Sequence, residues 1–309
     1  MKKNIIAISA ILLSASVAQA ADEATKFSGF ADAQWTFGEG TTGASIADGA
    51  VRMSKMLGEG SLNIDIPYSL STVANSNDFN LGQDKAQAYI NYKYANGFSW
   101  RLGQWDGIFG LERNDSPDFQ FARHGALWGL QAKTHTGLMV GYALSDKMSV
   151  DVYVAGVADQ GSTNTSTDSI GDTLPELGAK FSMSGDLRVS LGASYAKVAS
   201  DLSNLYVNGT AGMAFGALDL GLDIQAKKSG NDGDLGLGAG VTGIYGLSDT
   251  LKASIRAQYL SNINPENTIE VTVGPQFDMT KDLRVKVDYT LTNAGDTSHA
   301  GAVAAIYSF

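Results

Sequence analysis

Apolar and polar residues alternate along much of this chain, and this feature most restricts how it can fold. In 251–259, Leu, Ala, Ile, Ala and Tyr alternate with Lys, Ser, Arg and Gln, and 187–195 and 283–291 repeat the pattern. A period of two places alternate side chains on opposite faces of a β-strand. Such two-faced strands are typical of a membrane-spanning barrel, although a soluble β-sandwich alternates in the same way.

The N-terminal segment Met1–Ala20 is typical of a secretory signal peptide. Lys2 and Lys3 form its positive start, 5–17 is an apolar run, and Ala18-Gln19-Ala20 matches the A-x-A cleavage pattern. The apolar run is too short to cross a bilayer as a helix. We therefore expect export, cleavage after Ala20, and a single domain over 21–309.

The other end of the chain favours the outer membrane over a soluble sandwich. The sequence closes with Tyr307-Ser308-Phe309, which resembles the C-terminal signature that the assembly machinery of Gram-negative outer-membrane barrels recognises. Tyr307 and Phe309 would share one face of a last strand, at the level where aromatic rings meet the membrane interface. We expect these two residues to act as the assembly signal.

Composition agrees with a barrel that spans the membrane. The sequence holds 44% hydrophobic residues, yet no second apolar run approaches the length of a transmembrane helix, so a closed barrel is the remaining way to cross a bilayer. Loss of Lys2 and Lys3 leaves 20 basic against 32 acidic residues, a net charge of −12, which argues against nucleic-acid binding. Cysteine is absent, which excludes disulfides and thiolate chemistry.

Turn residues divide the chain into hairpins. Seven short turns are expected at 58–60, 96–97, 145–147, 184–186, 215–217, 247–249 and 280–282, and eight longer connections at 38–47, 70–84, 107–135, 158–173, 199–203, 228–233, 262–266 and 295–298. This alternation predicts an all-β, transmembrane, antiparallel up-and-down barrel of about 16 strands, with 14–18 as the range. Barrels of this size enclose an aqueous channel.

The longest connection, 107–135, is the third long loop and carries the strongest functional signal. Its charged residues are interleaved with Phe109, Phe119, Phe121 and Trp128, which would be poor solvent-exposed surface. We expect this loop to fold into the lumen and narrow it, although it could instead lie on the outer rim. The candidate constriction residues are Glu112, Arg113, Asp115, Asp118 and Arg123.

Strand parity turns many charged side chains toward the lumen. The candidate pore-wall bases are Arg52, Lys85, Lys93, Arg101, Arg188, Lys252, Arg256, Arg284 and Lys286. We hypothesise that third-loop acids oppose Arg52, Lys93 and Arg101, and that a basic zone near the periplasmic mouth is formed by Arg101, Arg188, Lys252 and Arg284. The net negative charge of the chain favours the passage of cations, while the bases on the pore wall favour anions. The sequence therefore leaves open whether the pore prefers cations or anions.

One part of the chain is similar to a known family. It holds Lys85-Ala86-Gln87-Ala88-Tyr89-Ile90-Asn91-Tyr92-Lys93, then 96–105 (NGFSWRLGQW), then Phe109-Gly110-Leu111-Glu112, with 137–142 (GLMVGY) after the loop. This succession over 85–157 resembles the putative β-barrel porin-2 (OmpL-like) family. The resemblance implies a porin, an open channel for passive diffusion of small hydrophilic solutes and ions, with no defined substrate.

Other function classes are less well supported. The three histidines, His124, His135 and His299, belong to loops and not to a constellation with a nucleophile, so we expect no enzyme and no cofactor or metal. The G-x-G-x-x-G at 238–243 lies within an expected strand, where small lumen-facing residues explain it better than a dinucleotide. A structural or adhesive barrel without an open pore is the alternative. Expected partners are outer-membrane lipid and lipopolysaccharide, the barrel assembly machinery, and small hydrophilic solutes and ions. The sequence leaves open whether the barrel is a homotrimer or a monomer.

Overall fold

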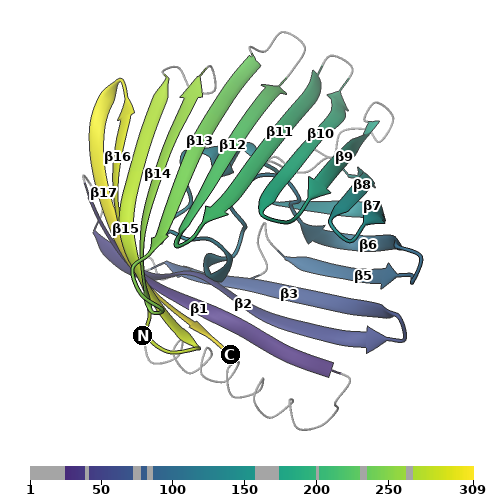
Figure 1. The fold of residues 1–309 in the computed structure, drawn as a ribbon, viewed down its shortest axis with the longest axis horizontal. Coiled ribbons are helices and arrows are strands. Elements are labelled where there is room, and N and C mark those ends of the chain that lie inside the picture. The colour runs from purple at the N-terminus through teal and green to yellow at the C-terminus, as the bar shows by residue number, and fades with distance from the viewer. Residues whose placement is uncertain are drawn as a thin grey trace.

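Sixteen of the described strands join edge to edge into a closed antiparallel barrel (Figure 1). The computed structural model describes residues 25–38, 42–71, 78–81, 86–156, 174–199, 202–229, 235–261 and 267–309. Each strand pairs with the next one along the chain, and β1 pairs with β17 to close the ring. The expected barrel of about 16 strands is therefore confirmed.

The strands have the following bounds. They are β1 (Thr25–Gly38), β2 (Gly43–Leu57), β3 (Gly60–Ser71), β5 (Gln87–Lys93), β6 (Phe98–Asp106), β7 (Thr134–Ser145), β8 (Met148–Ala155), β9 (Leu174–Met183), β10 (Leu187–Ala199), β11 (Leu202–Phe215), β12 (Leu218–Ser229), β13 (Leu235–Gly246), β14 (Leu251–Ser261), β15 (Thr268–Asp278), β16 (Leu283–Ala294) and β17 (Asp296–Ser308). A short extra strand, β4 (Asp78–Leu81), pairs with the end of β3.

The two ends of the described chain close the barrel together. Phe30 lies opposite Ser308 in the β1–β17 ladder. Phe309 extends this ladder, because its N–H donates to the Gly29 carbonyl and the Gly29 N–H donates to the Phe309 carbonyl, both at 3.0 Å. A side chain at Gly29 would lie 2.6 Å from the Phe309 ring. Glycine thus makes room for the terminal aromatic residue at the seam.

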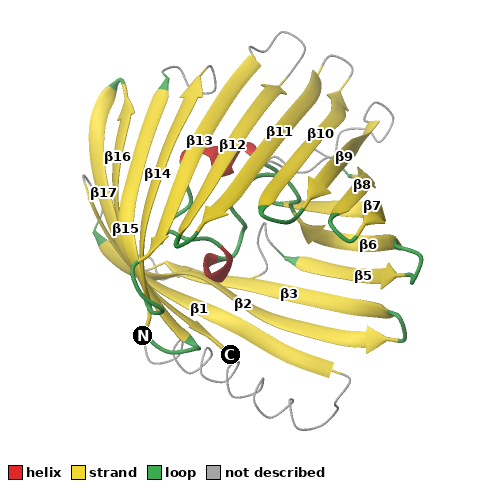
Figure 2. Ribbon diagram, viewed as in Figure 1, coloured by secondary structure: helices red, strands yellow, loops and turns green. Residues whose placement is uncertain are grey.

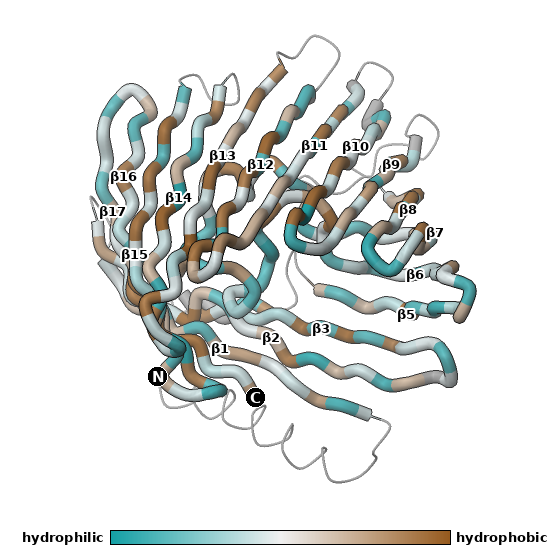
Figure 3. The backbone as a smooth tube through the Cα atoms, viewed as in Figure 1, coloured by the Kyte–Doolittle hydropathy of each residue, from teal (hydrophilic) through white to brown (hydrophobic). Residues whose placement is uncertain are grey.

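The two faces of the sheet have the polarity of a membrane barrel. Large apolar side chains such as Leu102, Val152 and Ile255 are exposed on the outside, while Gln225, Thr272 and Asp288 are almost completely buried on the inside. Figure 3 shows hydrophobic and hydrophilic residues alternating along the strands. This arrangement is the reverse of a soluble protein, and it suits lipid outside and water or polar protein inside.

All seven predicted short turns are confirmed, since each one separates two paired strands. Some long connections are shorter than predicted. Strand β2 begins at Gly43, within the predicted loop 38–47, and β16 and β17 are joined through Gly295, which has a positive φ of 86°. The predicted loop 70–84 contains β4, and β7 takes His135 out of the third loop. The predicted signal peptide and Lys85 lie outside the described residues.

Among the described residues, helical structure occurs in the third long loop alone. Two short 3₁₀ helices, η1 (Ser116–Asp118) and η2 (Ala126–Leu130), occur between β6 and β7 (Figure 2). No helix in the part of the chain that the structure describes is long and apolar enough to cross a membrane.

Candidate functional site

The third loop, 107–133, runs through the lumen and is bound to the wall on several sides. The backbone N–H of Gly110 donates to Asn208 Oδ1 of β11, and that of Leu111 donates to Asp223 Oδ2 of β12, both at 3.0 Å. Further along, the Arg123 N–H donates to Asp288 Oδ2 of β16, also at 3.0 Å. Because β11 and β16 are five strands apart in the ring, the loop crosses the interior. The predicted infolding is confirmed.

Glycines on the inner wall receive the apolar side chains of the loop. A Cβ at Gly192 of β10 would lie 2.4 Å from the Phe109 ring, and one at Gly238 of β13 would lie 2.3 Å from Leu127. Gly240, also on β13, lies under the same Leu127, with a Cβ distance of 2.8 Å. The G-x-G-x-x-G sequence therefore leaves space for η2, and any side chain at these positions would displace the loop.

Lys286 of β16 holds the η1 segment against the wall. Its buried ammonium donates to the carbonyl oxygens of Ser116 at 2.6 Å, of Phe121 at 3.2 Å, and of Phe119. The ammonium also lies 4.7 Å from the centre of the Phe119 ring. On the other side of η1, Asp48 Oδ2 accepts a hydrogen bond from the Ser116 N–H at 3.0 Å. This segment is consequently fixed from two sides.

Arg256 of β14 is the second anchor and is 1% exposed. Its guanidinium lies 2.6 Å from Glu112 Oε1 of the loop and 3.2 Å from Glu270 Oε1 of β15. It also donates to the Arg123 carbonyl at 3.2 Å and stacks over the Phe121 ring at 4.5 Å. The other carboxylate oxygen of Glu112, Oε2, accepts a hydrogen bond from the Gly125 N–H at 2.8 Å. Charges that the sequence assigned to the constriction thus act largely to position the loop.

Arg52 of β2 forms ion pairs with two carboxylates of the loop. Its guanidinium bonds to Asp115, lies 2.8 Å from Asp65 Oδ2 of β3, and lies 4.0 Å from Asp118 Oδ2. Burial raises the pKa of Asp115 to about 7; Arg52 opposes this shift, and the carboxylates of Asp65 and Asp48 add to it. This acidic group and Arg52 lie on one side of the lumen, on β2, β3 and η1.

The charge of Asp115 is expected to change the ion preference of the lumen near neutral pH. As the pH falls from 8 to 6, Asp115 takes up a proton, one negative charge is lost, and the reversal potential in a salt gradient shifts toward anions. The variant Asp115→Asn should lack this step. An equal shift in wild type and variant would contradict the prediction.

The other predicted wall bases have partners that the sequence did not single out. Arg188 of β10 forms an ion pair with Asp219 of β12. Asp278 is shared by two bases, since Lys252 Nζ lies 3.6 Å from its Oδ2 and Arg284 Nε lies 2.7 Å from its Oδ1. Two carboxylates, Asp219 and Asp278, lie among the bases of the expected basic zone near the turns, so its positive charge is partly compensated. Asp219 has the parity of Asp223, and Asp278 that of Glu270, so strand alternation could have found both.

Lys93 and Arg101 do not oppose the loop acids in the expected way. Both occupy lumen-facing positions of β5 and β6, but Lys93 is exposed near the short turn, and Arg101 lies over the Tyr89 ring at 4.6 Å. Within the described residues, no ion pair joins either base to a third-loop carboxylate. Of the three wall bases in that hypothesis, Arg52 alone meets loop acids in this part of the chain.

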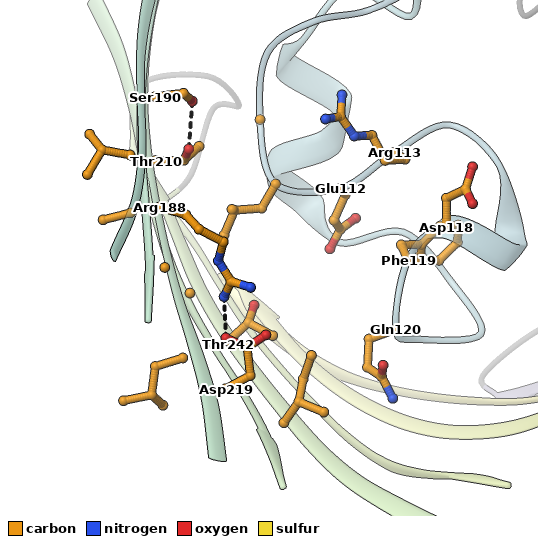
Figure 4. Close-up of a pocket in the computed structure, with 18 of the residues that line it drawn as sticks. Glu112, Arg113, Asp118, Phe119, Gln120, Arg188, Ser190, Thr210, Asp219 and Thr242 are labelled. Atoms are coloured by element: carbon orange, nitrogen blue, oxygen red, sulfur yellow. Dashed lines mark hydrogen bonds and ion pairs between the residues drawn. The ribbon is translucent and has the colours of Figure 1, made fainter. Parts of the chain in front are cut away.

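A cavity of about 570 Å³ remains between the loop and the wall. Figure 4 shows Arg188, Ser190, Thr210, Asp219 and Thr242 on the wall, across the space from Glu112, Arg113, Asp118, Phe119 and Gln120 of the loop. Arg113 and Asp118 are the exposed charged residues of that loop segment. Strands β9–β13 therefore face an open, polar part of the lumen.

The three histidines have structural surroundings. His124 stacks on Trp128 with ring centres 3.8 Å apart, and His299 bonds to the Tyr289 hydroxyl at 2.5 Å on the outer face. His135 belongs to β7 and not to the loop, and it packs with Tyr153 in a buried aromatic cluster that contains Trp105 and Phe109. Among the described residues, no group of three or more His, Asp or Glu is arranged to hold a metal ion.

Comparison with known families identifies the chain. The family described as Putative beta-barrel porin-2, OmpL-like, matches residues 16–303. The chain belongs to this family. It is a porin, with the outer membrane of Gram-negative bacteria as its location, in agreement with the resemblance carried by 85–157. No curated protein matches the chain.

Solved structures share the fold of this porin at low sequence identity. OmpF of Salmonella typhi in complex with daunomycin has a TM-score of 0.69 at 14% identity, covering 92% of this chain and 97% of that one. An anion-selective porin from Comamonas acidovorans has a TM-score of 0.67 at 14% identity, covering 92% of this chain and 99% of that one. The trimer form of OmpT from Vibrio cholerae has a TM-score of 0.63 at 14% identity, covering 92% of this chain and 99% of that one. These likenesses concern the fold alone.

Proposed function

We propose that the porin, with its mature chain starting at Ala21 as one barrel domain, conducts small hydrophilic solutes and ions by passive diffusion. The observation that carries this proposal is the cavity of about 570 Å³ between the third loop and the β9–β13 wall. About half of the residues that line it are polar or charged, and the loop crosses the lumen beside it. Solutes would pass along this side of the loop.

The predicted site residues divide into two roles under this proposal. Arg113, Asp118 and Arg188 would meet solutes directly, because they line the cavity and keep exposed side chains. Asp115 with Arg52 would contribute charge from the opposite side. Lys286, Arg256, Glu112 and Arg123 would hold the loop in place, and Lys93, Arg101, Lys252 and Arg284 would set the potential along the wall.

The channel proposal excludes catalysis as the main activity. Its support is the family, together with the structural surroundings of His124, His135 and His299. We further propose export by the cleaved segment Met1–Ala20, and assembly through Tyr307 and Phe309. Tyr307 has an exposed outward side chain and Phe309 lies at the barrel seam. A homotrimer with lipopolysaccharide around it fits the trimer form of the related fold.

Planar-bilayer recording of the refolded mature porin tests the channel proposal. We expect steady, ohmic single-channel steps in potassium chloride, with a reversal potential in a salt gradient that reports the ion preference. Folding is checked first by the shift in gel mobility between heated and unheated samples. Folded protein that inserts but does not conduct would overturn the proposal in favour of a structural or adhesive barrel.

A further inference from the structure

Three wall hydroxyls form a row along one side of the cavity. Ser182 of β9 lies opposite Ser190 of β10, and Ser190 lies opposite Thr210 of β11. The Ser190 and Thr210 hydroxyl oxygens are 2.7 Å apart (Figure 4), and all three residues line the cavity. Adjacent strands are about 4.8 Å apart. The row therefore presents hydroxyl groups at a spacing that a chain of alcohol groups on a small solute can follow.

Two basic residues flank this row on the wall. Lys180 precedes Ser182 by two residues on β9, and Arg188 precedes Ser190 by two residues on β10, so each pair shares the lumen face. The Arg188 guanidinium lies against Gly212, where a Cβ would be 3.0 Å away. The Lys180 ammonium donates to the Ile108 carbonyl, which carries no charge. Arg113 of the loop lines the same cavity with an exposed side chain.

The carboxylates that line the cavity are mostly neutralised by partners. Glu112 pairs with the buried Arg256, and Asp219 pairs with Arg188. Asp118 keeps a side chain that is 53% exposed, and it lies 4.0 Å from Arg52, which also pairs with Asp65 and Asp115; the charge of Asp118 is therefore compensated only in part. Arg113 and Lys180 have no carboxylate within ion-pair distance in the described part of the chain. Arg113 and Lys180 therefore supply positive charge to the region between the loop and the hydroxyl row, where the nearest opposing carboxylates are Asp118 of the loop and Asp151, which lies opposite Lys180 on β8.

We propose that this cavity is a subsite for small hydroxylated anions of the sugar-acid class. The carboxylate of the solute would bind Arg113 and Lys180, while its hydroxyl groups would exchange hydrogen bonds with Ser182, Ser190 and Thr210. The cavity volume is within the range of small-molecule sites. This inference rests on the proposed channel function and adds a substrate class to it.

Gluconate block of single-channel current tests the subsite. Gluconate carries a carboxylate and a row of hydroxyls, sorbitol carries the hydroxyls alone, and propionate carries the charge alone. In potassium chloride we expect gluconate to cause resolved, concentration-dependent interruptions that equimolar sorbitol and propionate do not cause. A porin that conducts normally but is blocked no more by gluconate than by the other two would overturn the subsite, while leaving the channel proposal intact.

Two substitutions localise the block. Arg113→Gln should weaken gluconate binding by about ten-fold or more, because a hydrogen bond to a charged group is lost. Thr210→Val, which keeps the shape and removes one hydroxyl, should weaken it by about three-fold. Lys281→Gln is the matched control, since Lys281 is an exposed turn lysine whose side chain is 89% exposed and lies outside the cavity. Equal gluconate affinity in wild type and in Arg113→Gln would overturn the proposal.

Discussion

Replacement of Lys286 by methionine is expected to release the η1 segment from the wall and to give larger, noisier single-channel currents. Methionine keeps the length and packing of the lysine stem but cannot donate to the carbonyl oxygens of Ser116, Phe119 and Phe121. Leaving these buried acceptors without a donor costs about 3 kcal/mol or more. The loop would then sample positions farther from β16, and the lumen would be wider on average.

The effect of Lys286→Met is measured as step size and open-channel noise in planar bilayers. Lys252→Met is the matched control, because Lys252 also points into the lumen but pairs with Asp278 near a short turn. The control should keep wild-type noise. Unchanged currents in Lys286→Met, or the same increase in both variants, would show that Lys286 does not hold the loop.

Strand alternation and turn chemistry were sufficient to predict the barrel. From Leu251 to Tyr259 in β14 and from Leu283 to Leu291 in β16 every second residue is apolar. Lipid outside the barrel requires this period, so the outward and inward faces of these strands could be assigned from sequence. Turns such as Asn96-Gly97 were predictable because Gly97 adopts a positive φ of 87°, a conformation that glycine favours. Local sequence therefore carried most of the information on the fold.

Strand ends were less predictable because small and polar residues hide the alternation. The first residues of β2, Gly43-Ala44-Ser45, and of β17, Asp296-Thr297-Ser298, resemble loop sequence but continue the ladder. Beyond the apolar belt, both faces of a strand meet a polar environment. There is then no physical reason for apolar and polar residues to alternate, but the strand continues because its backbone hydrogen bonds are still made.

The contacts of the third loop could not be derived from sequence. Lys286 lies 170 residues from Ser116, and Arg123 lies 165 residues from Asp288. Parity predicts that such wall residues face the lumen, but a loop without regular structure has no period that sets its position against the wall. The grouping of Asp115 and Asp118 around Arg52, and not near Lys93 and Arg101, likewise joins residues far apart in the sequence, with Asp115 lying 63 residues from Arg52.

Replacement of Arg256 by glutamine is expected to have the largest effect on stability. Arg256 is the shared counter-ion of Glu112 and Glu270, whose side chains are 14% and 13% exposed. Without it, two carboxylates remain buried near each other, which costs about 3–5 kcal/mol. By contrast, Arg188→Gln breaks a pair whose side chains are 50% and 39% exposed, so its cost should stay below about 1 kcal/mol.

Urea unfolding of the refolded porin in detergent, followed by gel mobility, separates charge from packing at this position. The double variant Arg256→Gln with Glu112→Gln should recover part of the lost stability, because it removes one of the two uncompensated carboxylates. A lost hydrogen bond or a cavity alone would give no recovery, since the second substitution restores neither. Wild-type stability of Arg256→Gln would contradict the prediction. It would mean that water reaches Glu112 and Glu270, and that the packing of Phe109 and Leu127 on the wall glycines holds the loop.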